Sequence, residues 1–257
     1  MTASQRLTVL ASLALTLLLS LAFLLPFATS ANAASWRWCS SDSEGTWQPG
    51  FGRWFIQNDA WNGGHGPQTI CAYNYHHWAV NSKQPRNDGE VMTYPNSQKN
   101  FGPAANLPMA PFNRFRAINS RFSITVPHGS GLRYNAAYDV WYGKGWDTTS
   151  EVMMWFYTVG VDMGGSRYLG KAHIYGQTFN VYKYDGSPPE FVFRLNHNVT
   201  HGTAHIQSAT QWLVNHGQMK ASSGLTAIPF GFEVRSTGGV YHTFRVNSLD
   251  IYTARKL

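Results

Sequence analysis

Charged side chains are scarce in this chain. Asp, Glu, Lys and Arg make up 13% of the 257 residues, whereas aromatic residues reach 15% and include ten Trp. Disordered chains and long helices are usually much richer in charge, so this composition argues against both. Together with 24 Gly, it favours a β-rich protein with an aromatic-lined binding surface.

Clustered positive charge is also lacking. The formal net charge is +7, but basic residues such as Lys144, Arg167, Lys171 and Lys183 are scattered along the chain. A nucleic-acid-binding protein gathers its basic residues into a patch, so we expect no nucleic-acid partner. A weak, salt-sensitive attraction to acidic polymers stays open.

Long apolar runs are missing after the first 33 residues. Near the start, Arg6 precedes an apolar run from Leu7 to Phe27, and Ala31-Asn32-Ala33 follows it. This pattern predicts a secretory signal peptide over 1–33, and Pro26 favours cleavage over the alternative of a membrane anchor. We therefore expect a secreted, extracellular domain of residues 34–257 that is monomeric and makes no membrane contact.

Cysteine is limited to two residues, Cys39 and Cys71, and both lie in the predicted mature domain. An exported protein meets an oxidising compartment, so we expect one disulfide between them. The alternatives are two free thiols or two cysteine ligands of a metal ion. A metal site is disfavoured because further ligand residues at a useful spacing are lacking.

Internal repeats, low-complexity tracts and Pro/Thr-rich linkers are absent, which indicates one domain without an appended module. Short apolar segments separated by turn residues predict an all-β sandwich or jelly roll of antiparallel sheets. The expected strands are Phe55–Asn58, Ile70–Tyr75, Val91–Tyr94, Arg121–Val126, Ala136–Tyr142, Glu151–Val159, His173–Ile174, Thr178–Tyr184, Glu190–Leu195, Ala227–Arg235 and Val240–Tyr252. One helix is expected over Ala204–Met219, packed against the outside of a sheet.

Glutamate occurs only five times. Glu151 begins one expected apolar strand, and Glu233 lies within another. In a strand, Glu151 shares one face with Met153, Trp155 and Tyr157, while the intervening residues face the core. By the same alternation, Glu233 shares a face with Gly231 and Arg235. If both strands cross one concave sheet, the two glutamates can oppose each other, as glycoside hydrolysis requires.

A third acid has the same strand context. In Tyr138-Asp139-Val140-Trp141-Tyr142, Asp139 and Trp141 face together. An acid beside a nucleophile can hydrogen-bond to it and hold its geometry. An ordinary solvent-side Asp is the alternative.

Signatures of other chemistries are lacking. His197, His201 and His205 have a spacing that could bind a metal on a helix, but Asn196, Asn198 and Gly202 disfavour a continuous helix there. A Gly-x-Ser-x-Gly elbow is absent. We therefore expect neither a metal site nor a cofactor.

Five segments, in this order, resemble the family 12 glycoside hydrolases. They are Asn58-Asp59-Ala60-Trp61, Val91-Met92-Thr93-Tyr94-Pro95-Asn96, Tyr134-Asn135-Ala136-Ala137-Tyr138-Asp139-Val140-Trp141, Glu151-Val152-Met153-Met154-Trp155-Phe156 and Gly231-Phe232-Glu233. The late helix and the cysteine pair also resemble that family. The chain departs from it at Asn58-Asp59, where the family often has two asparagines.

The resemblance implies a β-jelly-roll with a concave cleft and endo-acting, retaining hydrolysis of β-1,4-glucans. By position it implies that Glu151 is the nucleophile, Glu233 the acid/base, and Asp139 the acid that contacts the nucleophile. The substrate-binding residues it suggests are Asn58, Trp61, Trp141, Met153 and Trp155. The alternatives are a jelly-roll xylanase and a non-catalytic, lectin-like carbohydrate-binding protein.

Overall fold

The computed structural model describes residues 35–48, 53–86, 89–102, 109–144 and 147–256. The predicted signal peptide at 1–33 lies outside these residues. The fold described below is that of the unit formed by residues 36–257. Within the described part of the chain, no helix has the length and apolar character needed to cross a membrane.

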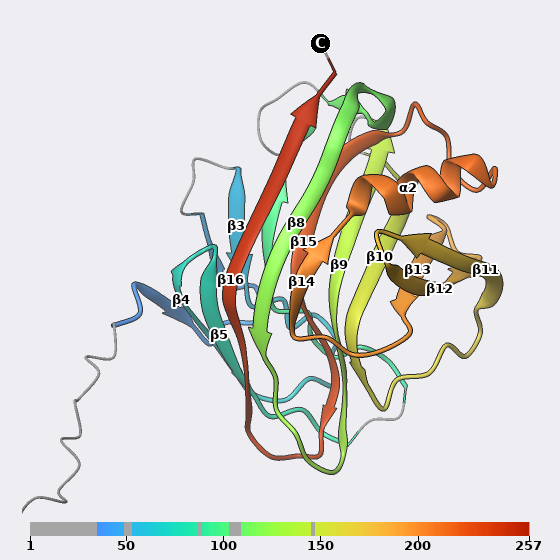
Figure 1. The fold of residues 1–257 in the computed structure, drawn as a ribbon. Coiled ribbons are helices and arrows are strands. Elements are labelled where there is room, and N and C mark those ends of the chain that lie inside the picture. Colours follow the sequence, from blue (N-terminus) through green and yellow to red (C-terminus); the bar gives the residue numbers. More distant parts are fainter. Residues whose placement is uncertain (1–34, 49–52, 87–88, 103–108, 145–146, 257) are drawn as a thin grey trace, which may run out of the picture. The chain divides into compact units, whose positions relative to one another are not determined.

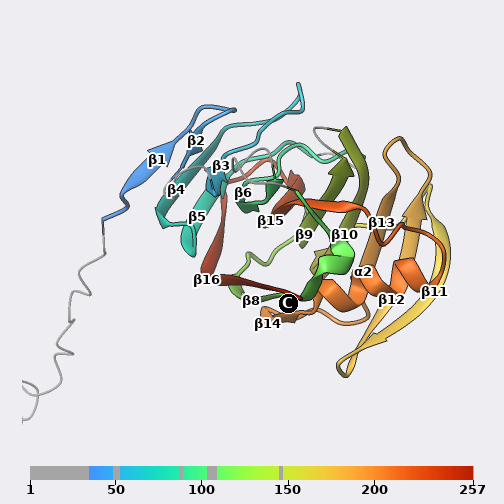
Figure 2. The ribbon, with the colours of Figure 1, turned by 90° about the horizontal axis from the view of Figure 1, so that it is seen from above.

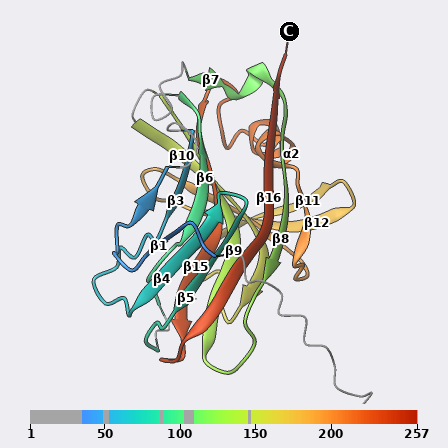
Figure 3. The ribbon, with the colours of Figure 1, turned by 90° about the vertical axis from the view of Figure 1, so that its left-hand side faces the viewer.

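Two β-sheets face each other across the core, which confirms the all-β sandwich (Figure 1). The six-stranded sheet has the order β1 (Trp38–Ser40), β4 (Gln68–Asn74), β5 (His77–Ser82), β16 (His242–Arg255), β8 (Phe115–Thr125), β14 (His201–Ala204). The ten-stranded sheet has the order β11 (Arg167–Ile174), β12 (Gln177–Tyr184), β13 (Glu190–Leu195), β10 (Asp147–Val159), β9 (Leu132–Lys144), β15 (Gly224–Thr237), β6 (Asn96–Asn100), β3 (Trp54–Gln57), β2 (Thr46–Trp47), and β7 (Ala110–Pro111) also pairs with β15. Figure 3 shows β16 and β8 on one side of the molecule and β3, β6 and β10 on the other.

One strand pair in the ten-stranded sheet is parallel, although antiparallel sheets were expected. Strand β13 runs parallel to β10, with Glu190 opposite Glu151. A parallel neighbour requires a long crossover, and here the β11–β12 hairpin lies between the two strands in sequence. The sheet is therefore mixed.

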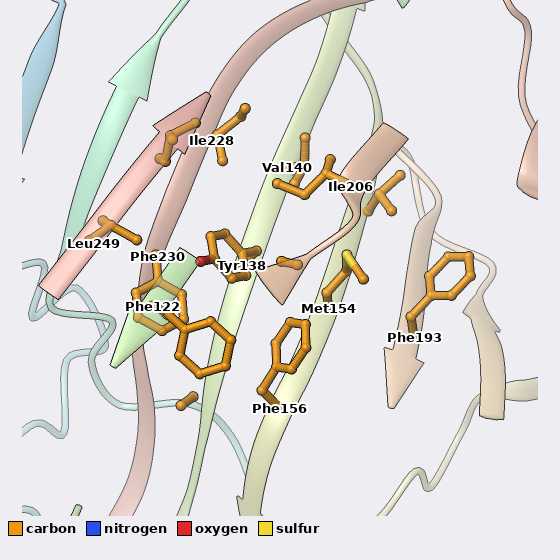
Figure 4. Close-up of a cluster of buried hydrophobic side chains, with 14 of the residues drawn as sticks. Phe122, Tyr138, Val140, Met154, Phe156, Phe193, Ile206, Ile228, Phe230 and Leu249 are labelled. Atoms are coloured by element: carbon orange, nitrogen blue, oxygen red, sulfur yellow. The ribbon is translucent and has the colours of Figure 1, made fainter. Parts of the chain in front are cut away.

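The core between the sheets is largely aromatic. Phe122 of β8 lies 5.3 Å from Phe230 of β15 and 4.8 Å from Phe156 of β10, measured between ring centroids. Figure 4 shows these rings meeting in the middle of the sandwich beside Tyr138. The buried Tyr138 hydroxyl donates to Ser120 Oγ at 2.8 Å, so the polar tip of this ring is satisfied without water.

The single α-helix among the described residues, α2 (Ile206–Asn215), packs against β8 of the six-stranded sheet and β11 of the ten-stranded sheet. Its buried residues Ile206, Ala209 and Leu213 join the same core cluster as the sheet residues. Trp212 meets Phe193 of β13 edge to face at 5.9 Å. In Figure 2 the helix lies beside β14 and β12. The helix is shorter than the predicted Ala204–Met219 and ends before Gly217, whose φ of +68° lies outside the helical region.

Strand β10 confirms the predicted alternation over most of its length. Val152, Met154 and Phe156 belong to the core cluster, whereas Met153 and Trp155 belong to a separate cluster on the other face. The prediction for Tyr157 is wrong. A β-bulge between Trp155 and Tyr157 shifts the register, and Tyr157 packs against the main core, parallel to the ring of Tyr134.

The expected strand Val91–Tyr94 is also absent, because only an isolated bridge joins Thr93 to Val234. The strand that forms nearby is β6, Asn96–Asn100, after Pro95. Its sequence, Asn-Ser-Gln-Lys-Asn, has no apolar alternation, so its strand character comes from pairing with β15 and β3. Five further strands, β1, β2, β5, β7 and β14, were not predicted, and neither was the first part of β11.

The disulfide prediction is confirmed. Cys39 of β1 and Cys71 of β4 are bonded and are direct partners in the strand register. The bond ties the edge strand of the six-stranded sheet to its neighbour.

Candidate active site

A cleft of about 750 Å³ lies on the face of the ten-stranded sheet that is turned away from the core. It contains all three predicted acids and four of the five predicted substrate-binding residues. Its lining residues are Asp59, Trp61, Gly89, Glu90, Val91, Tyr94, Asp139, Trp141, Glu151, Met153, Trp155, Gly164, Tyr184, Glu190, Glu233 and Arg235.

Strand β9 lies at the centre of this site, between β10 and β15. Asp139 and Trp141 point from it into the cleft, as alternation predicts. On one side of β9, strand β10 places Glu151 opposite Trp141 and Met153 opposite Asp139. On the other side, β15 places Glu233 opposite Asn135. Three adjacent strands thus each contribute one acid to the same cleft.

Glu233 is buried and is held by its strand neighbour. The Asn135 side-chain amide donates a hydrogen bond to Glu233 Oε2. Burial raises the pKa of Glu233 and repulsion by Glu190 adds to this, while the Asn135 hydrogen bond and the charge of Arg235 oppose the rise. The net effect favours a Glu233 that keeps its proton above the ordinary range of a glutamate.

Glu151 has an acidic neighbour that the sequence did not reveal. Glu190 lies directly opposite it on the parallel strand β13, where neighbouring strands are about 4.8 Å apart. Burial raises the pKa of Glu151 well above its ordinary value, and repulsion by Glu190 and then by Glu233 raises it further. Burial also raises the pKa of Glu190.

Asp139 is deeply buried between the two glutamates. Burial raises its pKa strongly, and the charges of Glu233 and Glu151 add to this, against a hydrogen bond with Tyr94. The carbonyl oxygen of Ala137 lies 3.2 Å from the Tyr94 hydroxyl and is an alternative acceptor for its single hydrogen. Because a protonated Asp139 avoids two repulsions at once, this arrangement favours a neutral acid here.

Trp61 stands at the wall of the cleft. Its side chain is 55% exposed, so the indole is accessible to a ligand. Beside it, Asp59 adopts a φ of +44°. Burial, and then the charge of Glu44, raises the pKa of Asp59 to about 6.

Asn58 does not line the cleft, contrary to its predicted role in substrate binding. It is fully buried, and its side-chain nitrogen donates to the carbonyl oxygen of Asp42 at 2.9 Å. Its side-chain oxygen accepts from Gln68 Nε2 at 3.0 Å. Asn58 therefore anchors the segment that carries Asp59 and Trp61 rather than reaching a ligand.

Met153 and Trp155 form the floor of the cleft. Both are almost completely buried and pack with Ala137 and Val192 in a cluster on the cleft side of the sheet. The accessible indoles of the site are therefore Trp61 and, to a smaller extent, Trp141.

A second hollow of similar size, about 760 Å³, has a different chemistry. It is lined by Lys144, Lys220 and several hydroxyl side chains, and none of its described lining residues is acidic. Size alone does not distinguish the two hollows, but only the cleft offers paired carboxyl groups.

Comparison with known families decides the class of protein. The sequence profile of Glycosyl hydrolase family 12 matches residues 52–253. The chain belongs to this family. As a family 12 member it is a glycoside hydrolase, which excludes the lectin-like alternative.

Solved structures of low sequence identity share the family 12 fold. The xyloglucanase domain of NopAA, a type three effector from Sinorhizobium fredii solved with cellobiose, is 22% identical, with a TM-score of 0.74 over 86% of this chain and 100% of that one. A family 12 xyloglucanase from Bacillus licheniformis is 20% identical, with a TM-score of 0.73 over 84% and 100%. Endoglucanase 3 from Trichoderma harzianum is 22% identical, with a TM-score of 0.73 over 86% and 99%. A search of curated protein sequences finds no match.

Three residues of this family 12 chain that line the cleft or bind one of its acids were not predicted to act there. Asn135 lies on the same face of β9 as Asp139, so alternation could have identified it. Tyr94 reaches the site from an irregular segment, and Glu190 reaches it through a parallel pairing. No local sequence pattern indicates either of these two.

Proposed function

We propose that this family 12 enzyme cleaves internal β-1,4-glucosidic bonds of cellulose or a related β-glucan with retention of configuration. The observation that carries the proposal is the placement of Glu151 and Glu233 in one cleft, on the two strands that flank β9. Retaining hydrolysis needs one such carboxyl group as nucleophile and the other as acid and base.

In the first step, the Glu151 carboxylate attacks the anomeric carbon as the bond to the leaving oxygen breaks. Glu233 gives its proton to that oxygen, so the leaving sugar departs as a neutral alcohol. The raised pKa of Glu233 supports this role, because the acid must still hold its proton when substrate binds. Asn135 fixes the orientation of the carboxyl group.

Glu151 must be ionised to attack, although burial and two like charges oppose this. A proton on Asp139 and another on Glu233 remove repulsion around Glu151 and let it carry the single negative charge of the trio. Asp139 thus acts as a positioning residue that stabilises the ionised nucleophile.

In the second step, Glu233, now a carboxylate, takes a proton from a water molecule. The water oxygen attacks the anomeric carbon and the bond to Glu151 breaks. Two inversions at this carbon give net retention, and both glutamates return to their starting protonation states.

Azide rescue tests the two roles. With an aryl β-cellobioside as substrate, Glu151→Ala plus azide should give the α-glycosyl azide, because azide replaces the missing nucleophile. Glu233→Ala plus azide should give the β-glycosyl azide, because azide replaces the activated water. The opposite products would exchange the two assignments, and no azide product from either variant would contradict the mechanism.

The substrate class needs a separate measurement. Trp61, exposed at the cleft wall, would stack on a sugar ring at the non-reducing side. Reducing-sugar release should be measured on carboxymethyl cellulose, barley β-glucan, xyloglucan and xylan. We expect release from at least one β-glucan and none from xylan, whereas release from xylan alone would support the xylanase alternative.

Export of the enzyme is part of the proposal. The apolar run ending at Ala31-Asn32-Ala33 and the Cys39–Cys71 disulfide both support it. When the full chain is expressed in a secreting bacterial host, the protein in the medium should begin at Ala34. Retention in the membrane with an intact N-terminus would favour the anchor alternative.

A further inference from the structure

The turn between β11 and β12 carries an unusual residue. Ile174 pairs with Gln177, so Tyr175 and Gly176 alone form the turn, with φ values of +47° and +79°. A turn with two positive φ values favours Asn-Gly or Gly-Gly, and a bulky residue at its first position is a genuine outlier. The choice of Tyr at this place calls for a role outside the turn itself.

The Tyr175 ring is presented to solvent. It is 77% exposed, the highest value among the large apolar side chains of the described residues. One face stacks on His205, with 4.0 Å between ring centroids and 19° between planes. Stacking on His205 restrains the orientation of the Tyr175 ring. Because the side chain is highly exposed, the other face of the ring is accessible to a ligand.

Two hollows flank this stacked pair. One, of about 340 Å³, contains Tyr175 together with the amide side chains of Gln207, Gln211 and Asn215 on α2. The Oε1 atom of Gln207 is buried without a hydrogen-bond partner among the described residues. The other hollow, of about 440 Å³, contains His205.

This second hollow extends onto the outer face of the six-stranded sheet. It includes Asn119 of β8, and Asp250 and Tyr252 of β16, and the Tyr252 ring is 54% exposed. Figure 1 shows the end of β11 beside β14 and the start of α2. The stacked pair links the two hollows, because Tyr175 lines one and His205 lines the other. No residue of either hollow lines the catalytic cleft.

We propose that these two hollows form a second carbohydrate-binding site, centred on Tyr175, that holds a β-glucan chain outside the catalytic cleft. A pyranose ring has an apolar face and an equatorial rim of hydroxyl groups. The open face of the Tyr175 ring suits the apolar face of the sugar. The amide, imidazole and carboxylate groups beside it can hydrogen-bond to the hydroxyl groups. The choice of β-glucan among hexose polymers rests on the proposed function.

A peptide or lipid occupant fits less well. Ile174, the aliphatic residue that precedes the turn, is buried, so the exposed apolar surface consists of separate aromatic rings rather than a continuous patch. The site would keep the enzyme on the polymer after each cleavage and raise the local substrate concentration at the cleft.

The test uses Tyr175→Asn, because Asn suits this turn better than Tyr and the variant should fold at least as well. Binding to insoluble cellulose and to a barley β-glucan matrix is measured in the inactive Glu151→Gln background, with Trp61→Ala added to weaken binding in the cleft. Tyr168→Ala is the matched control, since Tyr168 is a similarly exposed Tyr of β11 that lines neither hollow.

We expect Tyr175→Asn to bind the polymer about threefold to tenfold more weakly, as the loss of one ring stack implies, while Tyr168→Ala binds normally. With the catalytic residues intact, Tyr175→Asn should retain its kcat/KM on a soluble aryl cellobioside. Unchanged polymer binding by a folded Tyr175→Asn variant would overturn the proposal. If the enzyme hydrolysed no β-glucan at all, the proposed function would fail, yet Tyr175-dependent retention on the polymer would still be measured independently.

Discussion

At the scale of single residues, the described lining of the cleft contains more acidic than basic side chains. Asp59, Glu90, Asp139, Glu151, Glu190 and Glu233 line it, and Arg235 is the one Lys or Arg among its described lining residues. Because these acids repel one another in a poorly solvated site, each charge removed should change the protonation of its neighbours.

Glu190→Gln tests this coupling on activity. Removing the charge opposite Glu151 should lower the pKa of Glu151, and also that of Glu233, since Glu190 raises both. Activity needs Glu151 ionised and Glu233 protonated, so both limbs of the kcat/KM profile should move to lower pH. Glu90→Gln is the control, because Glu90 lines the cleft but is not among the causes of either shift. Identical profiles for Glu190→Gln and the parent would contradict the coupling.

Asp59→Asn tests the same physics on stability. The pKa of Asp59 is raised from 3.8 to about 6 in the folded protein, so the folded state binds this proton more tightly than the unfolded chain. The contribution of Asp59 to the free energy of unfolding therefore falls as pH rises from about 4 to about 6 and is constant above. Asp59→Asn removes this loss and should stabilise the protein by about 1 to 3 kcal/mol at pH 7, and by close to zero at pH 4.

Urea unfolding at both pH values measures the difference. Glu44→Gln, which removes the smaller cause and keeps the Asp59 carboxyl group, should give a smaller gain over the same range. An Asp59→Asn gain that is equal at pH 4 and pH 7 would show that titration of this group is not its origin.

At the scale of elements, the fit between β15 and the segment before β6 holds Glu233 in place. Gly231 lies two residues before Glu233, and a Cβ atom there would stand 2.1 Å from the carbonyl oxygen of Pro95. Gly231→Ala should therefore push the two segments apart. We expect a loss of about 1 to 3 kcal/mol in unfolding free energy and a reduced kcat from a displaced Glu233.

Gly63→Ala is the matched control, because an added Cβ at Gly63 meets nothing within 4 Å. Thermal unfolding and steady-state kinetics of the two variants separate a close-packing effect from a general cost of replacing glycine. Equal stability of Gly231→Ala and the parent would contradict the packing argument.

The elements also show what sequence can predict. Alternation placed Glu151, Asp139 and Glu233 on the cleft face correctly, since each lies in a strand whose other face is apolar. It failed at Tyr157, where a bulge changes the register, and at β6, whose polar sequence forms a strand only because its neighbours supply the pairing. Glu190 could not be assigned, because its position depends on which strand β13 joins and in which direction.

At the scale of the described domain, the two sheets have different tasks. The ten-stranded sheet carries Asp139, Glu151, Glu190 and Glu233 on strands β9, β10, β13 and β15. The six-stranded sheet covers the other side of the core and contains the Cys39–Cys71 bond between β1 and β4. Stability and chemistry can therefore be changed separately, and the disulfide gives a direct way to do so.

Reducing the Cys39–Cys71 bond should lower the melting temperature while kcat below that temperature stays unchanged. The bond closes a segment with a sequence separation of 32, for which the chain-entropy model gives about 3 to 4 kcal/mol. The catalytic acids lie outside this segment, so the chemical step should not depend on it. Trp61 lies inside it, so any kinetic effect should be on KM.

The double variant Cys39→Ser/Cys71→Ser should reproduce the lower melting temperature and be insensitive to reductant. A loss of kcat in the folded, reduced protein would show that the six-stranded sheet also controls the geometry of the acids.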